Sequence, residues 1–453
     1  MDIATAPRGE LVRIIFEQKD KIEALEAQIA ELRSQIKQQG PHQQESPPPF
    51  VKANIKHHRK SPRKKRAVNF TRKKDTPTRQ VFHTYHVCPD CGGELGRPSV
   101  SYTRQTIDIP PVAPEITEHV VFKRWCFSCH KRVAPHVQLQ GVALGRRRIG
   151  IRLMSIIGML REACRQPLET IQAYLEILYS LHLSKGELVN VLHTTAVIGE
   201  QTYESLMQQV RRAAVVHADE TGGRENGKNG YFWSFSTQDV HFLVYDKSRS
   251  NGMVTRVLGE ETDTDGFCGV LTSDFYTAYN IYHGFHQRCW VHLLGDIKEL
   301  KEKHAKHPPL NTWAKKVKQV YEEANAYGGP DPGLPPGLKE QERIRKQQYF
   351  EQKLRVIAKP WLKKEVPMTT LCARIMKHLQ ELFVFIRFEG VPSDNNAAER
   401  MIRNTVVKRK ISGGTRSKRG SKTNAVLTSL FDTWKLQNKN PLEQCQLLLT
   451  SCQ

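Results

Sequence analysis

The stretch AAVVHADET (residues 213–221) decides the fold that we expect for the second half of the chain. Its first four residues are small or β-branched, and this apolar run predicts a buried strand that ends at Asp219. A second run, 269–272, leads in the same way into Ser273-Asp274. Further strands are expected at 231–236, 240–245 and 288–292. Because strands of an α/β sheet present their carboxyl ends at one edge, Asp219 and Asp274 are expected there together.

A third carboxylate, Glu399, is expected about two turns into a helix that Ser393 or Asp394 caps. Two strand-end carboxylates and one helix carboxylate supply the oxygen ligands that two Mg2+ ions, or Mn2+ in their place, need for phosphoryl transfer. Acids are also common at strand ends and helix caps for structural reasons. Glu220 and Asp394 are equally plausible ligands on chemistry alone, so the pattern leaves this choice open.

Two Cys-x-x-Cys pairs, Cys88/Cys91 and Cys126/Cys129, present four thiolates from two tight turns. Such a set closes a tetrahedral site that suits structural Zn2+. Strands expected at 103–109 and 116–125 would complete a zinc ribbon. A redox-active cysteine pair is the weaker alternative, because no βαβ pattern surrounds either pair.

Residues 145–205 carry leucine, isoleucine and valine at helical spacing, and short joints separate the runs. Helices are expected at 152–165, 168–181 and 185–195. Ser184 and Glu187 form a capping box that opens the third helix. Three short helices with a tight turn before the last predict a small all-α, helix-turn-helix-like domain that binds DNA, although plain helical bundles share this pattern.

A long helix is expected at 9–38, since neither proline nor glycine occurs between Glu10 and Gln39. Its apolar residues recur at spacings of four and three, broken only by Gln18; they are Leu11, Ile15, Ile22, Leu25, Ile29, Leu32 and Ile36. Isoleucine at a and leucine at d favour a parallel two-stranded coiled coil, and hence a homodimer or higher oligomer. A helix docked on the protein's own core is the alternative.

The chain has 69 Lys and Arg against 46 Asp and Glu, a formal net charge of +23, which favours a polyanionic partner. A membrane partner is excluded, because the longest apolar stretch, 149–160, contains Arg152 and falls short of the ~18 residues that a span needs. The N-terminal segment has no apolar region of a secretion signal, so we expect an intracellular protein.

The positive charge is concentrated in two places. The stretch 52–79 holds 12 basic residues and one acid, and such a block binds phosphates without reading sequence, unless it is only a linker or localisation signal. A second cluster follows Glu399, where cations would hold a DNA backbone beside the acids or simply form a solvated helix face. The expected DNA-binding residues are Arg63, Lys64, Lys65, Arg66, Arg72, Lys73, Lys74, Arg400, Arg403, Lys408, Arg409 and Lys410.

Four blocks of the second half resemble, in order, those of the insertion sequence 66 family of bacterial transposases. They are HADET (217–221), SDFYTAY (273–279), CWVH (289–292) and DNNAAER (394–400). The CPDCGG knuckle, the basic linker and the leading helix are similar too, so the resemblance covers nearly the whole chain. It implies a DDE transposase with a ribonuclease-H-like core, in which Asp219, Asp274 and Glu399 are the catalytic triad that holds Mg2+.

The resemblance also implies that Cys289 and His292 support this triad. The sequence departs from the family at Leu293-Leu294, where two arginines usually follow the histidine, so one DNA-backbone contact is in doubt. Double-stranded DNA at the element ends and at the target is the implied substrate. Accessory proteins of the same element are further implied partners, and the bacterial cytoplasm, at the nucleoid, is the implied location.

The expected organisation is multidomain. It comprises a coiled-coil helix (1–40), a disordered basic linker (41–80), a four-cysteine zinc-binding domain (81–140), a helical DNA-binding domain (141–205), and a ribonuclease-H-like core with C-terminal helices in two parts (206–295 and 386–453) around a helical insertion (296–385). The expected activity is Mg2+-dependent strand cleavage followed by transfer of the 3'-OH into target DNA. A metal-dependent nuclease that cuts without joining, and a non-catalytic DNA-binding regulator derived from a transposase, are the rival functions.

Overall fold

The computed structural model describes residues 75–135, 139–145, 147–260 and 262–451, together with 21, 23–29 and 31. The chain divides into two units, Met1–Asp108 and Ile109–Gln453. The described residues of the expected coiled coil are helical, and Leu25 and Ile29 of its apolar seam are exposed. The rest of that helix lies outside the described residues, as does most of the basic linker, with Arg63, Lys64, Lys65, Arg66, Arg72, Lys73 and Lys74.

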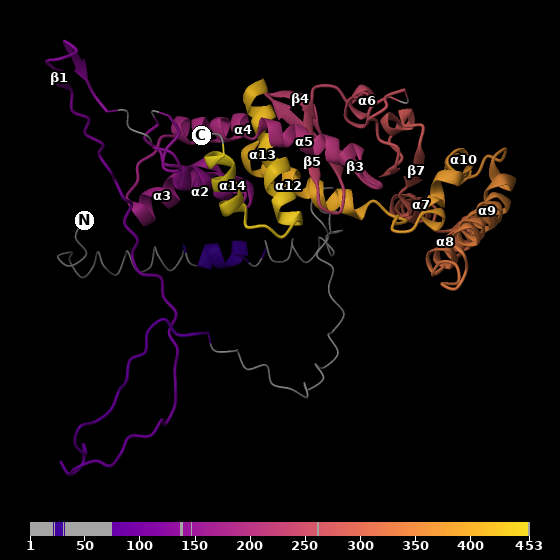
Figure 1. Cartoon of the computed structure of the whole chain (residues 1–453). Coiled ribbons are helices and arrows are strands. Elements are labelled where there is room, and N and C mark those ends of the chain that lie inside the picture. The colour runs from indigo at the N-terminus through magenta and orange to yellow at the C-terminus, as the bar shows by residue number, and fades with distance from the viewer. Residues whose placement is uncertain are drawn as a thin grey trace. The chain divides into compact units, whose positions relative to one another are not determined.

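A five-stranded mixed sheet organises the second unit (Figure 1). Its strands are β3 (Val215–Glu225), β4 (Lys228–Ser236), β5 (His241–Asp246), β6 (Val270–Ser273) and β7 (Phe285–Arg288), in the spatial order β5-β4-β3-β6-β7. The strands β3, β4 and β5 pair antiparallel, whereas β6 pairs parallel with β3 and with β7. The parallel ladder between β3 and β6 ends at the pair His217–Thr272, so Asp219 and Asp274 both lie just beyond it.

Two strands differ from the sequence-based prediction. β3 continues past Asp219 to Glu225, because it forms one arm of a hairpin with β4. The prediction of a strand at 288–292 is wrong, because β7 ends at Arg288 and a helix begins at Trp290. Trp290 and Leu293 are buried at helical spacing in the core of the helices that follow, and this packing overrides the local strand propensity.

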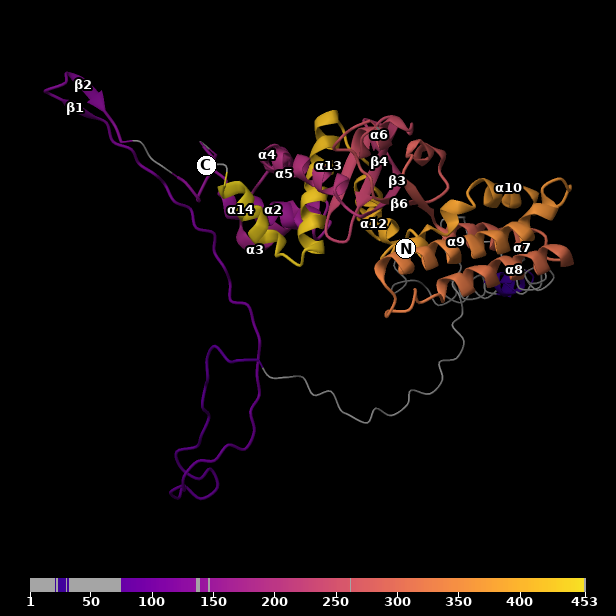
Figure 2. The same cartoon turned by 45° about the vertical axis from the view of Figure 1, so that its right-hand side comes forward.

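Helices α2 (Ile151–Glu162), α3 (Leu168–Tyr179), α4 (Lys185–Ile198) and α5 (Glu200–Arg211) precede the sheet and share one hydrophobic core with it. That core also holds residues of α6 (Gly252–Leu258), η2 (Thr277–Ile281), α13 (Lys418–Leu436) and α14 (Pro441–Thr450). Figures 1 and 2 show α13 and α14 beside the early helices. The capping box of Ser184 and Glu187 at the start of α4 is confirmed. The domain boundary expected at residue 205 falls within α5, so the helices expected to form a separate domain pack continuously with the sheet.

A helical insertion with its own hydrophobic core separates β7 from α12 (Asn396–Ser412). It consists of α7 (Trp290–Lys303), α8 (Pro308–Asn325), α9 (Pro336–Ala358), η3 (Lys359–Trp361), α10 (Thr369–Lys377), η4 (Gln380–Leu382) and α11 (Val384–Arg387). These helices lie beyond the edge strand β7 in Figure 1, and Figure 2 shows α7, α8, α9 and α10 together on the same side of the sheet. Within the described residues, no helix is both long and apolar enough to cross a membrane.

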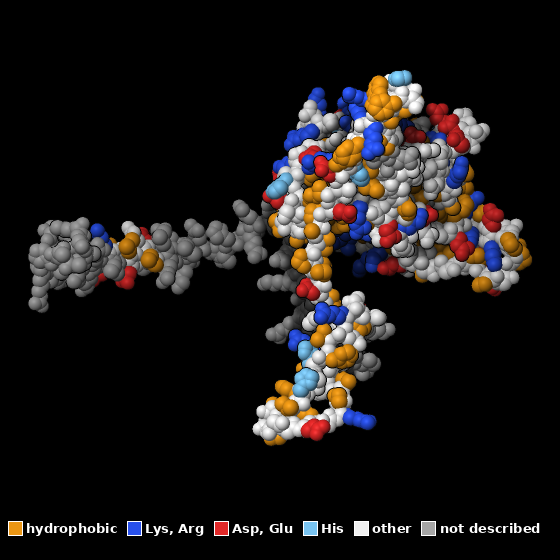
Figure 3. Space-filling model, turned by 60° about the vertical axis from the view of Figure 1, so that its left-hand side comes forward, with side chains coloured by type: hydrophobic (Ala, Val, Ile, Leu, Met, Phe, Trp, Pro, Cys, Tyr) orange, Lys and Arg blue, Asp and Glu red, His pale blue; other side chains and the backbone are white. Residues whose placement is uncertain are grey.

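Residues 75–135 contain little regular structure. Strands β1 (Arg124–Cys126) and β2 (Lys131–Val133) pair as an antiparallel hairpin, whereas the strands expected at 103–109 and 116–125 are absent apart from the start of β1. Ile107 is 82% exposed and Ile116 85%, and hydrophobic side chains are visible along this segment in Figure 3. The prediction fails here because no described residue covers these side chains, and isolated alternating strands are not stable in water.

Candidate active site

Asp219 lies on β3, where the parallel pairing with β6 has just ended. Burial and the charges of Glu220, Asp274 and Glu399 raise the pKa of Asp219 to about 7, although the Glu220 backbone N–H donates to its carboxylate at 2.9 Å and lowers the pKa. The three expected site acids are far apart in the sequence. They nevertheless lie close enough in the fold to act on one another electrostatically.

Asp274 directly follows β6, and its side chain accepts a hydrogen bond from the Tyr276 backbone N–H at 2.9 Å. Behind it, Arg288 of β7 donates to the Asp274 carbonyl oxygen at 2.8 Å. Arg288 is 1% exposed and also donates to Asn280 and to Glu381 of η4. It therefore joins the Asp274 turn to the helical insertion. The sequence alone does not reveal this role, because Glu381 lies far along the chain from Arg288.

Glu399 lies in the first turn of α12 rather than about two turns into it as expected. The helix begins at Asn396 because Asn395 is held by other elements. Asn395 Nδ2 donates to the Ala218 carbonyl oxygen of β3 at 2.8 Å, and its backbone N–H donates to Cys289 Sγ at 3.2 Å. Asn395, 1% exposed, thus fixes the start of α12 against the strand that carries Asp219.

Cys289 and His292, the expected supporting residues, lie beside the acids. His292 Nε2 is 3.7 Å from Glu399 Oε1. The neighbouring Cys289 side chain, and the negative charges of Asp274 and Glu399, raise the pKa of His292 to about 9 against the opposing effect of burial. An imidazole with this pKa is protonated at neutral pH, so His292 offsets part of the negative charge of the acids.

The two alternative ligands have partners of their own. Glu220 follows Asp219 on β3 and therefore faces the other side of the strand. Its side chain is 2% exposed and accepts hydrogen bonds from Tyr279, at 2.6 Å, and from Arg249. Asp394 Oδ1 accepts from the Asn396 backbone N–H at 2.9 Å, at the start of α12. The side chains of Arg249 and Tyr279 thus balance Glu220, whereas Asp394, like Asp219 and Asp274, accepts one backbone hydrogen bond.

The donor chemistry of Asp219, Asp274 and Glu399 fits a hard divalent cation. Carboxylate oxygens are the ligands that Mg2+ and Mn2+ prefer. Burial and, after it, the neighbouring negative charges raise the pKa of Asp219, and a bound cation would offset both effects. In the part of the chain that the structure describes, no group of three or more His, Cys, Asp or Glu side chains is arranged so that it could hold a metal ion. The fit therefore rests on the donor set and its charge.

Cations follow Glu399 along α12. Arg400, Arg403 and Lys410 are exposed, and positions 399, 403 and 410 fall on one side of a helix. Arg409 is half-buried, and its guanidinium donates to Thr221 Oγ1 of β3 at 3.1 Å.

Lys408 differs from the other members of the expected DNA-binding set. It is 3% exposed, and its amino group binds the carboxylate of Glu162 on α2. Thr428 and Asn424 of α13 accept from it as well. The amino group therefore faces the interior, and this placement does not support a contact with DNA.

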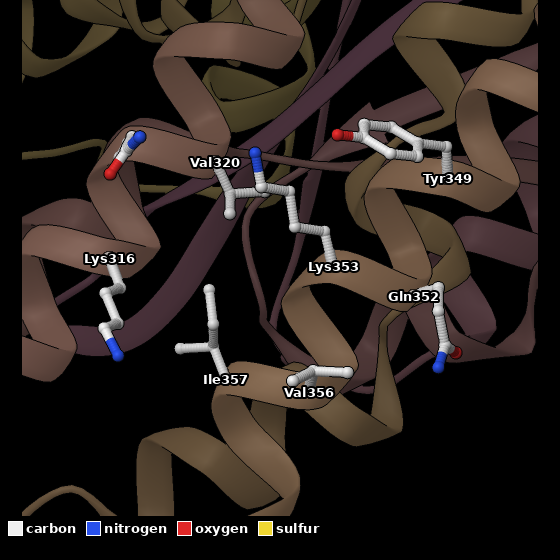
Figure 4. Close-up of a pocket in the computed structure, with 8 residues that line it drawn as sticks. Lys316, Val320, Tyr349, Gln352, Lys353, Val356 and Ile357 are labelled. Carbon is white, nitrogen blue, oxygen red and sulfur yellow. The ribbon is translucent and has the colours of Figure 1, made fainter.

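The structure also contains a cavity of about 570 Å3 between α8 and α9 of the insertion (Figure 4). Its lining residues are Lys316, Gln319, Val320, Tyr349, Gln352, Lys353, Val356 and Ile357. None of the expected site residues contributes to it, so the cavity is separate from the cluster of acids.

Each cysteine pair forms a turn that favours the thiolate. Hydrogen bonds from the backbone N–H groups of Asp90 and Cys91 lower the pKa of the Cys88 thiol. The Cys129 backbone N–H lies 3.4 Å from Cys126 Sγ and lowers the pKa of that thiol in the same way. Because the thiolate is the form that binds Zn2+, each pair suits that metal.

Two protein-family models match the chain. The model described as "Transposase IS66 family" matches residues 146–423, which include the sheet, the insertion and all three acids. The model described as "zinc-finger binding domain of transposase IS66" matches residues 86–130, which include both cysteine pairs. A search of curated proteins finds no match. The first match spans more than half of the sequence, and the chain therefore belongs to the IS66 family of transposases.

Proposed function

We propose that this transposase cuts DNA at the ends of its element and joins the freed 3'-OH ends to target DNA. In this proposal Asp219, Asp274 and Glu399 are the ligands of two Mg2+ ions, or of Mn2+. The observation that carries the proposal is geometric: Asp219 and Asp274 both lie just beyond the parallel β3–β6 ladder, and Asn395 holds the start of the Glu399 helix on the strand that carries Asp219. A mixed sheet whose parallel β3–β6 pairing ends just before two of these acids supports a ribonuclease-H-like core.

Each acid is held by a different part of the fold. Asp219 is paired within β3 to Ser234 of β4. The Asp274 turn is backed by Arg288, and the helix of Glu399 is held at its start by Asn395. When bound, the two ions supply activation of the attacking oxygen and stabilisation of the leaving oxygen.

His292 has an electrostatic role beside these ligands. Its pKa of about 9 keeps a proton on the imidazole at neutral pH. The protonated His292 side chain attracts the Glu399 carboxylate, 3.7 Å away, and reduces the repulsion between Glu399 and Asp274. Cys289 contributes in two ways: its side chain interacts with His292, and its Sγ accepts a hydrogen bond from the Asn395 backbone N–H.

The DNA backbone is proposed to lie along α12. The exposed Arg400, Arg403 and Lys410 would neutralise phosphates near Glu399, and Arg409 contributes by holding α12 on β3. Buried Lys408 is left out of this surface. The basic linker would add contacts that do not depend on sequence.

The N-terminal features are proposed to bind zinc and to pair subunits. Cys88, Cys91, Cys126 and Cys129 would hold one structural Zn2+, supported by the lowered pKa values of Cys88 and Cys126. The heptad pattern of 9–38 supports a coiled-coil dimer or higher oligomer. The helices of 141–205 would contact the element ends, with or without accessory proteins.

A strand-transfer assay tests the activity. The substrates are end-labelled linear duplexes that carry the terminal repeats flanking the gene, incubated with a target plasmid and Mg2+. We expect cleavage at the element end and covalent transfer of the label to the plasmid. Cleavage without transfer would favour the nuclease instead. Binding without either reaction would favour the non-catalytic regulator.

A further inference from the structure

Strand β3 and helix α12 run side by side and in the same direction away from the acids. Near their starts, Asn395 Nδ2 donates to the Ala218 carbonyl oxygen at 2.8 Å. Farther along, the side chain of Arg409 contacts the middle of β3. Beyond the end of α12, the Thr415 backbone N–H donates to the Arg224 carbonyl oxygen at 2.8 Å. Both elements therefore lead from the site to the turn between β3 and β4.

This turn and the loop 413–417 form one tightly packed unit. The Asn226 backbone N–H donates to the Thr415 carbonyl oxygen at 2.8 Å, and Ser421 Oγ donates to the Glu225 carboxylate at 2.7 Å. Gly414 has a φ of +122°, and a Cβ there would lie 2.5 Å from the Arg224 carbonyl oxygen. The close approach of loop and hairpin therefore requires glycine at this position.

Four exposed cations stand on this unit and define what we call the tip surface. They are Arg224 and Lys228 of the hairpin, and Arg416 and Lys418 of the loop and the start of α13. In the described ranges of the chain, none of the four forms a salt bridge with an acid. Glu225, the nearest acid in sequence, is buried and already interacts with Ser421 and Lys247. The tip surface is therefore a rigid patch of positive charge that the protein does not neutralise.

The distance from the acids to the tip surface matches a short length of duplex. A strand rises ~3.3 Å per residue, so the six residues from Asp219 to Glu225 span about 20 Å. Duplex DNA rises ~3.4 Å per base pair, so this span corresponds to about six base pairs. Exposed Arg403 and Lys410 of α12 lie along the same route.

We propose that the tip surface binds the phosphate backbone of the duplex that leads away from the cut site, about six base pairs from it. This inference rests on the proposed function, because it takes Asp219 as the point of cutting. An acidic protein segment would also satisfy four cations. DNA is favoured because the positive charge continues along α12 from Glu399 to the tip, an alignment that a separate protein partner does not need.

The test measures how salt changes the affinity of the full chain for DNA. A fluorescent duplex of random sequence is titrated at salt concentrations from about 50 to about 200 mM, and Kd is read from anisotropy. The variant Arg224→Ala/Arg416→Ala removes two cations of the tip surface. The control Lys298→Ala/Lys318→Ala removes two exposed cations of the insertion and therefore has the same net charge as the tip variant. The variant Arg224→Lys/Arg416→Lys retains the charge of the tip surface.

Loss of two phosphate contacts should reduce the slope of log Kd against log salt by about 1.8. The ratio of the tip variant's Kd to the wild-type Kd should therefore fall about tenfold between the lowest and the highest salt concentration. The control and the lysine variant should keep the wild-type slope, and both should cut saturating DNA at the wild-type rate. Equal slopes for the wild-type chain and the tip variant, or an equal loss in the control, would overturn the inference and leave the proposed function standing. A wild-type chain that binds no duplex would overturn both.

Discussion

Replacing Lys408 with methionine is expected to destabilise the fold and to leave DNA binding unchanged. The Lys408 amino group interacts with Glu162, Thr428 and Asn424, and the side chains of Lys408 and Glu162 are each 3% exposed. In Lys408→Met, the Glu162 carboxylate remains buried and keeps Thr428, at 3.2 Å, as its one side-chain donor among the described residues. Removal of one partner of a buried pair costs about 3–5 kcal/mol of unfolding free energy.

Equilibrium unfolding in urea measures this cost, and two further variants show its origin. Lys408→Met/Glu162→Leu removes both charges and should recover most of the loss, because a well-packed apolar pair can replace a buried ion pair. Lys410→Met changes an exposed lysine of the same helix, so its unfolding free energy should stay within about 0.5 kcal/mol of wild type. In DNA titrations, Lys410→Met should flatten the salt dependence of binding, whereas Lys408→Met should leave it unchanged. A Lys408→Met chain that is as stable as wild type and binds DNA with reduced salt dependence would instead place Lys408 on the DNA-binding surface.

Three further predictions concern pH, zinc and the basic linker. Burial and the charge of Arg288 hold the pKa of His286 well below its usual value, so the folded state needs this residue neutral and the unfolding free energy should fall as the pH drops below about 6.5. In His286→Gln, unfolding at about pH 7.5 and about pH 5.5 should show a weaker pH dependence, and an unchanged one would contradict the assignment. Metal analysis should find about one Zn2+ per chain, lost in Cys88→Ser but retained in Cys164→Ser, an exposed cysteine outside both pairs; zinc-free wild-type protein would exclude the site. Deletion of residues 52–79 should weaken DNA binding equally for all sequences and flatten its salt dependence, with cleavage at saturating DNA retained; a sequence-selective loss would count against this role.

Local patterns predicted those elements that local interactions determine. The Ser184–Glu187 capping box starts α4 as expected, and the apolar run before Asp274 forms β6. The second half of β3 could not be predicted in this way, because Gly222-Gly223 has low strand propensity. Packing explains the second glycine, because a Cβ at Gly223 would lie 2.7 Å from the ring of Phe232.

For the site, side-chain chemistry alone left five acids as candidates, and the family resemblance selected three of them. The structure supplies a physical reason for setting Glu220 aside, since its carboxylate is balanced by Arg249 and Tyr279. The roles of Arg288 and Asn395 escaped prediction, because each depends on partners that only the fold brings near. The burial of Lys408 could not be predicted either. In the sequence it resembles the exposed lysines of the same helix, and only the packing of α2 and α13 against it distinguishes it.

Single-turnover cleavage by carboxylate variants tests whether Asp219, Asp274 and Glu399 are the catalytic acids. Asp219→Asn, Asp274→Asn and Glu399→Gln are compared with the wild-type chain on an end-labelled element end, in Mg2+ and at matched DNA occupancy. Asp394→Asn, which changes a neighbouring carboxylate outside the proposed triad, is the control. We expect each triad variant to bind DNA without cutting it, while Asp394→Asn still cuts. Wild-type cleavage by any of the three triad variants would contradict the claim.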